Sequence, residues 1–131
     1  MPEQSREPAP GFRKYPDHKV AIAPGKARVR VLAGDTTVAD SARALLVQES
    51  RHDDVYYLPA EDVAMQYLHP TDNSTYCPFK GHASYWSVGN DPTLKDSVWS
   101  YQDPYQECAE ITGYLAFYAD RFDIQIEAAG T

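Results

Sequence analysis

Basic residues are scarce in this sequence. Lysine and arginine total 12 against 19 aspartate and glutamate residues, which gives a net charge of −7 and a pI of about 4.9. Binding to nucleic acid or to an anionic membrane surface requires clustered cations, so this composition argues against both partners. No stretch approaches the roughly 20 apolar residues of a membrane span, and the polar N-terminus lacks the apolar run of a signal peptide. We therefore expect a cytoplasmic protein.

Cysteine is almost absent as well. The two cysteines, Cys77 and Cys108, are more compatible with reduced thiols than with a disulfide in a cytosolic protein. No Cys and His residues occur at a spacing that recurs in zinc sites, and the nearest set is His69, Cys77 and His82. We therefore expect no bound metal and no cofactor.

Tyrosine is abundant, with ten residues against four phenylalanines, which favours a β-rich fold or a polar aromatic pocket. A proline-rich arm, predicted to be flexible, covers residues 1–16, and a single β domain covers residues 17–131. Strands are predicted at residues 18–23, 27–33, 36–39, 42–49, 55–58, 83–88, 97–101, 114–118 and 122–127. Because no long helix separates them, the sheets should be mainly antiparallel, with the last two strands forming a pair.

Two short helical segments are predicted. One or two turns fit residues 60–68, where Glu61 and Asp62 suit the positive end of a helix. The clearer helix begins near Pro104, because Asp103 can act as its N-cap and Gln106 completes a capping box. Gly113 should end that helix.

Six segments together resemble the bacterial and fungal family named domain of unknown function 427. They are Val-Ala-Asp-Ser (38–41), Val-Tyr-Tyr-Leu-Pro (55–59), Thr-Tyr-Cys-Pro-Phe-Lys-Gly (75–81), Ala-Ser-Tyr-Trp-Ser-Val (83–88), Trp-Ser-Tyr (99–101) and Ile-Thr-Gly-Tyr-Leu-Ala-Phe-Tyr (111–118). The resemblance implies a β-tent-like (Mss4-like) fold, in which two antiparallel sheets lean together over a cleft. The family also carries a nucleotidyltransferase-like label. The sequence contains no Gly-rich phosphate loop and no paired-aspartate metal motif.

The densest chemistry lies between Thr71 and Val88, where a thiol, an amine and aromatic rings follow one another. Residues 77–81 read as a turn, because Pro78 fixes its own φ and Gly81 can take a positive one. If this turn brings the Lys80 amine back to Cys77, the cation stabilises a thiolate and makes Cys77 a candidate nucleophile. The alternative is that Cys77 is a small buried apolar residue and Lys80 a solvated or structural charge.

Aromatic strands supply the rest of the candidate site. We expect a cleft that has Cys77 and Lys80 at its edge and some of the aromatic rings as its floor. About half of the rings should face the core, and the others can bind a ligand. Glu49 could hold Lys80 or a ligand amine, or form a structural ion pair. The candidate ligand-binding residues are Glu49, Tyr57, Tyr85, Trp86, Trp99 and Tyr101, and Tyr118 is a further aromatic of the same kind.

Three functions are compatible with these residues. The first is a domain that binds an unidentified small molecule, planar or anionic, near Lys80. The second is an enzyme that uses Cys77 as a nucleophile or redox thiol, and the third is a non-catalytic interaction module. Small-molecule binding is favoured, because the elements of a pocket are present and a complete catalytic set is not. A homodimer is left open.

Overall fold

Ten strands form three antiparallel sheets in the computed structural model, which describes residues 7–128. One sheet has the order β1-β4-β5, a second β10-β2-β3 and the third β6-β7-β8-β9. The strands are β1 (Val20–Pro24), β2 (Ala27–Ala33), β3 (Thr36–Ser41), β4 (Leu45–Glu49), β5 (Val55–Tyr57), β6 (Leu68–Cys77), β7 (Gly81–Val88), β8 (Val98–Ser100), β9 (Leu115–Phe117) and β10 (Asp123–Ala128). The fold is therefore mainly antiparallel β, as predicted, with three sheets rather than two.

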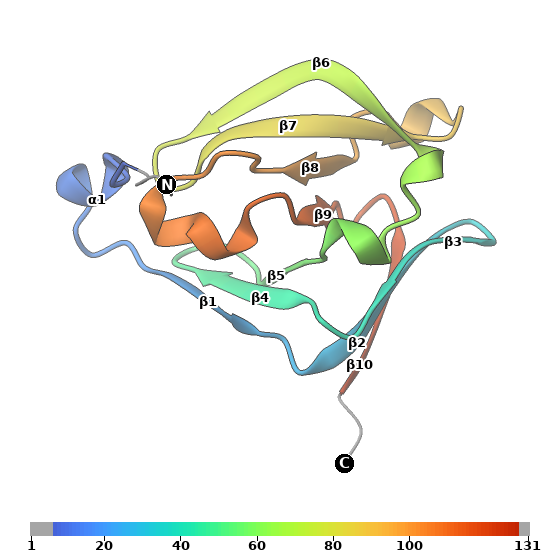
Figure 1. Cartoon of the computed structure of the whole chain (residues 1–131), viewed down its shortest axis with the longest axis horizontal. Coiled ribbons are helices and arrows are strands. Elements are labelled where there is room, and N and C mark those ends of the chain that lie inside the picture. The colour runs from blue at the N-terminus through green and yellow to red at the C-terminus, as the bar shows by residue number, and fades with distance from the viewer. Residues whose placement is uncertain (1–6, 129–131) are drawn as a thin grey trace.

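The helical segments are short. They are the α-helix α1 (Gly11–Lys14) and the 3₁₀ segments η1 (Ala60–Asp62), η2 (Met65–Tyr67), η3 (Pro92–Leu94) and η4 (Gln106–Ile111). In Figure 1 the four-stranded sheet lies above β1 and β4, and η4 lies between these two levels. Backbone hydrogen bonds between Leu58 and Leu115 join the end of β5 to β9, so two of the sheets are connected at this point.

On β2, buried and exposed side chains alternate along the strand. On β2, Val29 and Val31 are 1% exposed, whereas Arg28 between neighbouring buried residues extends to the solvent side. There its guanidinium donates two hydrogen bonds, of 2.9 and 2.8 Å, to the Asp40 carboxylate on β3. This is the half-buried strand that the pattern of residues 27–33 predicts.

The core is divided into two clusters, and β7 contributes to both. Tyr85 packs with Val47, Tyr57 and Tyr101 in the cluster around η4, while Trp86 packs against the cluster of Val29, Leu58 and Phe117. Successive residues of a strand point to opposite faces, so the two rings are separated by the backbone of β7. The prediction that Tyr85 and Trp86 lie on different faces is confirmed.

Two strand predictions were wrong. Strand β6 was not predicted, because it is an edge strand whose residues after Leu68 are mostly exposed and polar, and because it contains Pro70. The last two strands do not form a pair: β9 joins β8 and β10 joins β2. Their pairing was inferred from a short connection, yet a short connection also suits strands of neighbouring sheets.

The helix predicted at Pro104 begins two residues later, at Gln106, and its N-cap position is Tyr105 rather than Asp103. Tyr105 has an extended backbone, with φ −64° and ψ 164°. Its amide donates to the Lys80 carbonyl at 3.0 Å, and the next amide, of Gln106, donates to the Glu7 carbonyl at 2.9 Å. These tertiary hydrogen bonds satisfy the amides that a capping box would otherwise serve, so the capping prediction was wrong.

The N-terminal segment, residues 7–16, lies against the turn formed by residues 77–81. The Gly11 amide donates to the Pro78 carbonyl at 3.0 Å, and the Ala9 amide donates to Glu107 Oε1 at 2.9 Å. A Cβ on Gly11 would lie 2.7 Å from the Phe79 ring, so this close approach depends on glycine. The first six residues of the predicted arm lie outside the described residues, and the flexibility of the arm stays a prediction.

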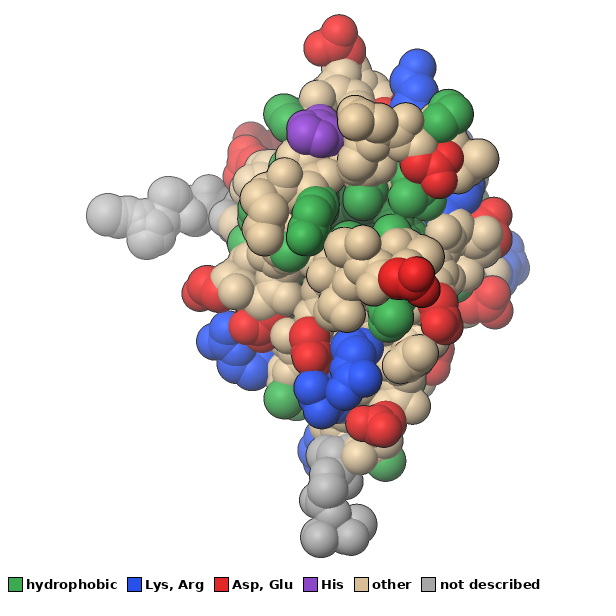
Figure 2. Space-filling view, turned by 90° about the vertical axis from the view of Figure 1, so that its right-hand side faces the viewer, with side chains coloured by type: hydrophobic (Ala, Val, Ile, Leu, Met, Phe, Trp, Pro, Cys, Tyr) green, Lys and Arg blue, Asp and Glu red, His purple; other side chains and the backbone are tan. Residues whose placement is uncertain are grey.

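The surface has mixed charge on the face seen in Figure 2, where acidic and basic side chains alternate and hydrophobic side chains gather in a hollow of the upper half. Basic side chains on this face occur in separate places rather than in one patch. Between residues 7 and 128, no helix is long and apolar enough to cross a membrane.

Candidate functional site

A cleft of about 420 Å³ lies where β4, β5, β7 and β8 meet the turn of residues 77–81. Its size falls within the roughly 300–1,000 Å³ that is usual for small-molecule sites. All the predicted site residues except Trp86 line it, namely Glu49, Tyr57, Cys77, Lys80, Tyr85, Trp99 and Tyr101. Residues from five separate segments of the chain thus meet in one concave surface.

Trp86 is the exception. It packs against the core cluster of Val29 and Phe117 and does not line the cleft. The reason is the alternation along β7, which turns Tyr85 toward the cleft and Trp86 away from it.

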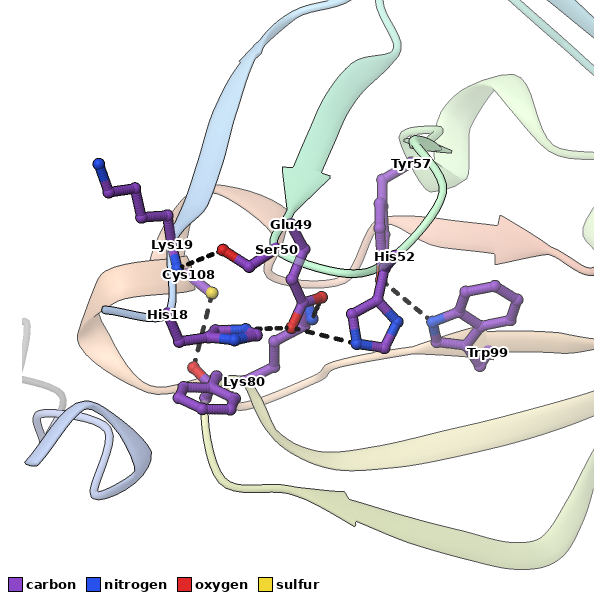
Figure 3. A network of polar contacts seen from close by, with 10 residues as sticks. His18, Lys19, Glu49, Ser50, His52, Tyr57, Lys80, Trp99 and Cys108 are labelled. Atoms are coloured by element: carbon purple, nitrogen blue, oxygen red, sulfur yellow. Dashed lines mark hydrogen bonds and ion pairs between the residues drawn. The ribbon is translucent and has the colours of Figure 1, made fainter. Parts of the chain in front are cut away.

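The most unusual feature of the cleft is a buried ion pair. The Lys80 ammonium binds Glu49 Oε1, and the side chains are only 7% and 8% exposed, respectively. The second carboxylate oxygen, Oε2, is 2.8 Å from His18 Nε2 and 3.9 Å from His52 Nε2. Figure 3 shows Glu49 at the centre of this group, with His18, His52 and Lys80 around its carboxylate.

Local structure explains how these groups meet. Glu49 is the last residue of β4, two positions after Val47, so its side chain points to the same face of the strand as the buried Val47 side chain. Lys80 precedes Gly81, whose φ of +118° allows the chain to turn back into β7. The Phe79 ring stacks on His18 with centroids 3.8 Å apart and an angle of 14°, and this contact positions the imidazole beside Glu49.

Opposing effects act on the Glu49 carboxyl. Burial raises its pKa, but the hydrogen bonds from Lys80 and His18 outweigh burial, and the pKa is lowered from its ordinary value. The carboxylate is therefore charged at neutral pH, and the Lys80 ammonium is paired with it. Lys80 is therefore a buried, paired charge, and the alternative that it is solvated was wrong, while its role in catalysis stays a prediction.

Tyrosine hydroxyls supply the polar groups of the cleft. The Trp99 indole N–H donates to the Tyr57 hydroxyl at 3.1 Å, and the hydroxyls of Thr75 and Tyr85 are 2.9 Å apart. The Tyr101 hydroxyl has no hydrogen-bond partner among the described residues. Burial raises the pKa of both Tyr57 and Tyr101, so these phenols stay protonated and can donate to a ligand.

The two thiols have different surroundings. Cys77 is partly exposed and lines the cleft, whereas Cys108 is fully buried in η4, with Sγ 3.7 Å from the Phe79 carbonyl oxygen. Burial raises the pKa of Cys108 to about 11. The ammonium of Lys80 is held by Glu49, and no hydrogen bond joins it to Cys77 Sγ within the described part of the chain. The role of Cys77 as a nucleophile stays a prediction.

Some cleft residues were not predicted. His18 and His52 surround Glu49, and Tyr76 and Val47 line the cleft wall. His18, Val47 and His52 lie outside the motifs that directed attention to the site, whereas Tyr76 lies within the motif of residues 75–81. His18 meets Glu49 through the pairing of β1 with β4, which no motif indicates. In residues 7–128, no three His, Cys, Asp or Glu side chains are arranged to hold a metal ion.

The model of a family described as "Domain of unknown function (DUF427)" matches residues 21–128. This range contains all the predicted site residues and excludes His18. No curated protein matches the sequence.

Proposed function

The chain belongs to the DUF427 family, and from this premise we propose that it binds a planar small molecule in the aromatic cleft. The observation that carries the proposal is the composition of the cleft, in which tyrosine and tryptophan rings surround a nearly fully buried ion pair. Rings that keep a polar atom toward a cavity offer a ligand both stacking surface and hydrogen bonds.

The buried pair supports a functional interpretation. Taking two charges out of water costs several kcal/mol per ion, and well-packed apolar residues would often be at least as stable in their place. A desolvated ion pair inside a cleft is therefore typical of a binding site. The pair also fixes the Cys77–Gly81 turn against β4, which keeps the end of the cleft in one shape.

Charge favours a planar ligand over one whose anionic group contacts Lys80. The Lys80 ammonium is already neutralised by Glu49, and Asp53 adds a further carboxylate to the lining. An anion placed at Lys80 would have to displace Glu49 or approach both carboxylates, which is electrostatically unfavourable. A neutral ring system that stacks on Trp99 and accepts a hydrogen bond from Tyr101 avoids this cost.

The two tryptophans allow a direct test. Trp99 lines the cleft and Trp86 does not, so Trp86→Phe leaves Trp99 as the sole tryptophan. We expect aromatic fragments that raise the Tm in a thermal-shift screen to change the fluorescence of this variant. In the matched Trp99→Phe variant, the remaining Trp86 should not respond to the same fragments. An equal response of both tryptophans, or a screen without binders, would contradict the proposal.

The Tyr101 hydroxyl should contribute to affinity but not to stability. Because it has no hydrogen-bond partner among residues 7–128, Tyr101→Phe removes a donor without leaving a protein group unpaired. We expect fragments found in the screen to bind about 5- to 10-fold more weakly, the value of one hydrogen bond, with an unchanged Tm. Tyr67→Phe, on an exposed ring outside the cleft, is the control. Unchanged affinity in Tyr101→Phe for every fragment would place the ligand elsewhere.

A further inference from the structure

A second cavity, of about 610 Å³, adjoins the aromatic cleft. His52 and Phe79 line both cavities, and the stacked pair of Phe79 and His18 lies between them. The second cavity is formed by the N-terminal segment on one side and the turn after β4 on the other. Its lining residues are Lys14, Tyr15, Pro16, Asp17, His18, Ser50, Arg51, His52 and Phe79.

Positive charge distinguishes this cavity. Lys14 and Arg51, from two segments far apart in sequence, both line it, against the single carboxylate of Asp17. Neither cation forms an ion pair with a carboxylate of residues 7–128. The Lys14 ammonium lies 5.7 Å from the centroid of the Tyr15 ring, so both cations keep their charge available to a ligand beside the imidazoles of His18 and His52.

The two neighbouring cavities are lined by more negative than positive charges. The aromatic cleft contains Glu49 and Asp53 against Lys80. A third cavity, of about 820 Å³, contains Asp53, Asp54 and Asp123 without lysine or arginine. Among these three cavities, only the one at Lys14 and Arg51 has an excess of fixed positive charge. Electrostatics therefore favours an anionic group there and disfavours it in the other two.

The backbone at Arg51 forms a tight turn. The His52 amide donates to the Glu49 carbonyl at 3.1 Å, which closes a turn with Arg51 as its third residue. Arg51 has a φ of +67°, at the turn position where type II turns favour glycine. The same region of φ is adopted by Lys26 and Asp96, which line none of the three cavities, so the strain does not by itself mark a site. The turn places Arg51 in the wall of the second cavity.

We propose that the ligand of the aromatic cleft carries an oxyanion, a phosphate or a carboxylate, and that Lys14 and Arg51 bind this group in the adjoining cavity. The inference rests on the proposed function and specifies its ligand class, an aromatic ring system with an acidic substituent. The ring lies against Trp99 and the tyrosines, and the substituent passes Phe79 and His52 to reach the two cations. Arg51 can bind such a group through two parallel N–H donors.

The two cavities have separate reporters for an NMR titration. The Trp99 indole N–H reports on the cleft, and the ring signals of His52 and His18 report on the cationic cavity. The probes are phenyl phosphate, benzyl alcohol and inorganic phosphate. We expect phenyl phosphate to shift both sets of signals and to bind about tenfold more tightly than either smaller probe. Benzoate in place of phenyl phosphate distinguishes a carboxylate from a phosphate.

The decisive variant is Arg51→Gly, which removes the cation and relieves the positive φ. We expect it to bind phenyl phosphate about tenfold more weakly, to bind benzyl alcohol like the wild type, and to keep or raise the Tm. Lys26→Gly is the matched control, because Lys26 is also an exposed cation with a positive φ, of 52°, but lines none of these cavities. It should leave all affinities unchanged.

Each alternative result has a distinct meaning. If Arg51→Gly binds phenyl phosphate as tightly as the wild type, or no more weakly than Lys26→Gly does, the oxyanion site is wrong and the aromatic cleft stands. If inorganic phosphate shifts the histidines in an Arg51-dependent manner while no probe shifts Trp99, the oxyanion site is supported and the aromatic cleft is overturned.

Discussion

Lys80→Met should lower the free energy of unfolding by about 3 kcal/mol at pH 7, near the lower end of the 3–5 kcal/mol found when one partner of a buried ion pair is removed. The methionine keeps the volume of the lysine stem but leaves the Glu49 carboxylate, 8% exposed, without its ammonium. His18 remains beside Oε2 at 2.8 Å, which keeps the loss near the lower end. Urea denaturation of the two proteins measures the difference.

The pH dependence has a definite sign. In the wild type the Glu49 pKa is lowered, so its contribution to stability is present above the ordinary glutamate pKa of about 4.3 and is lost as the pH falls through the folded-state pKa. In Lys80→Met, burial acts against only the hydrogen bond from His18 and the weaker interaction with His52, and the Glu49 pKa should rise above its ordinary value. The resulting penalty is relieved as the pH falls through that raised pKa, so the two proteins should differ less at pH 5 than at pH 7.

Two further variants isolate the contribution of the Lys80–Glu49 ion pair to stability. Glu49→Gln combined with Lys80→Met removes both charges, and it should be more stable at pH 7 than Lys80→Met alone. Lys95→Met, on an exposed lysine, should change the stability by less than about 0.5 kcal/mol. A Lys80→Met protein as stable as Lys95→Met would show that Lys80 is solvated in solution.

The sequence predicts this fold where strands are half buried. Residues 27–33, 55–57 and 83–88 alternate or are rich in aromatic and β-branched side chains, and each is in a strand. The same reasoning misses β6, because an edge strand that pairs on one side only needs no apolar face. It also misplaces the helix at Asp103, since Tyr105 is held extended by a bond to the distant Lys80 carbonyl.

The site was predictable in its residue types but not in its pairings. The motifs around Cys77 and the aromatic strands bring forward residues that the structure gathers in one cleft. Sequence proximity suggested that Lys80 acts on Cys77, three positions away, whereas the structure pairs it with Glu49, 31 positions away. Long-range strand pairing decides which groups meet, and no local pattern encodes it. Of the residues that line the cavity at Lys14 and Arg51, only Phe79 belongs to a motif.

Phe79→Ala should release the N-terminal segment and lower the free energy of unfolding by about 3 kcal/mol, at the lower end of the range for Phe→Ala in protein cores. Phe79 is 9% exposed and stacks on His18, and the Phe12 ring meets its edge with centroids 4.9 Å apart. Without the ring, the segment keeps few contacts with the turn beyond the bond from the Gly11 amide to the Pro78 carbonyl. Trypsin should then cleave after Arg13 or Lys14 at least about tenfold faster, since local opening costs less.

A second phenylalanine separates local release from global destabilisation. Phe122 is 7% exposed and packs edge-on against Phe117, at 5.3 Å, in the core cluster remote from the N-terminal segment. Phe122→Ala should therefore lose similar stability while cleavage after Lys14 stays close to the wild-type rate. Phe79→Leu, which keeps apolar volume, should give an intermediate rate. If both alanine variants accelerate cleavage equally under native conditions, the segment opens only with the whole domain, and Phe79 has no specific role in holding it.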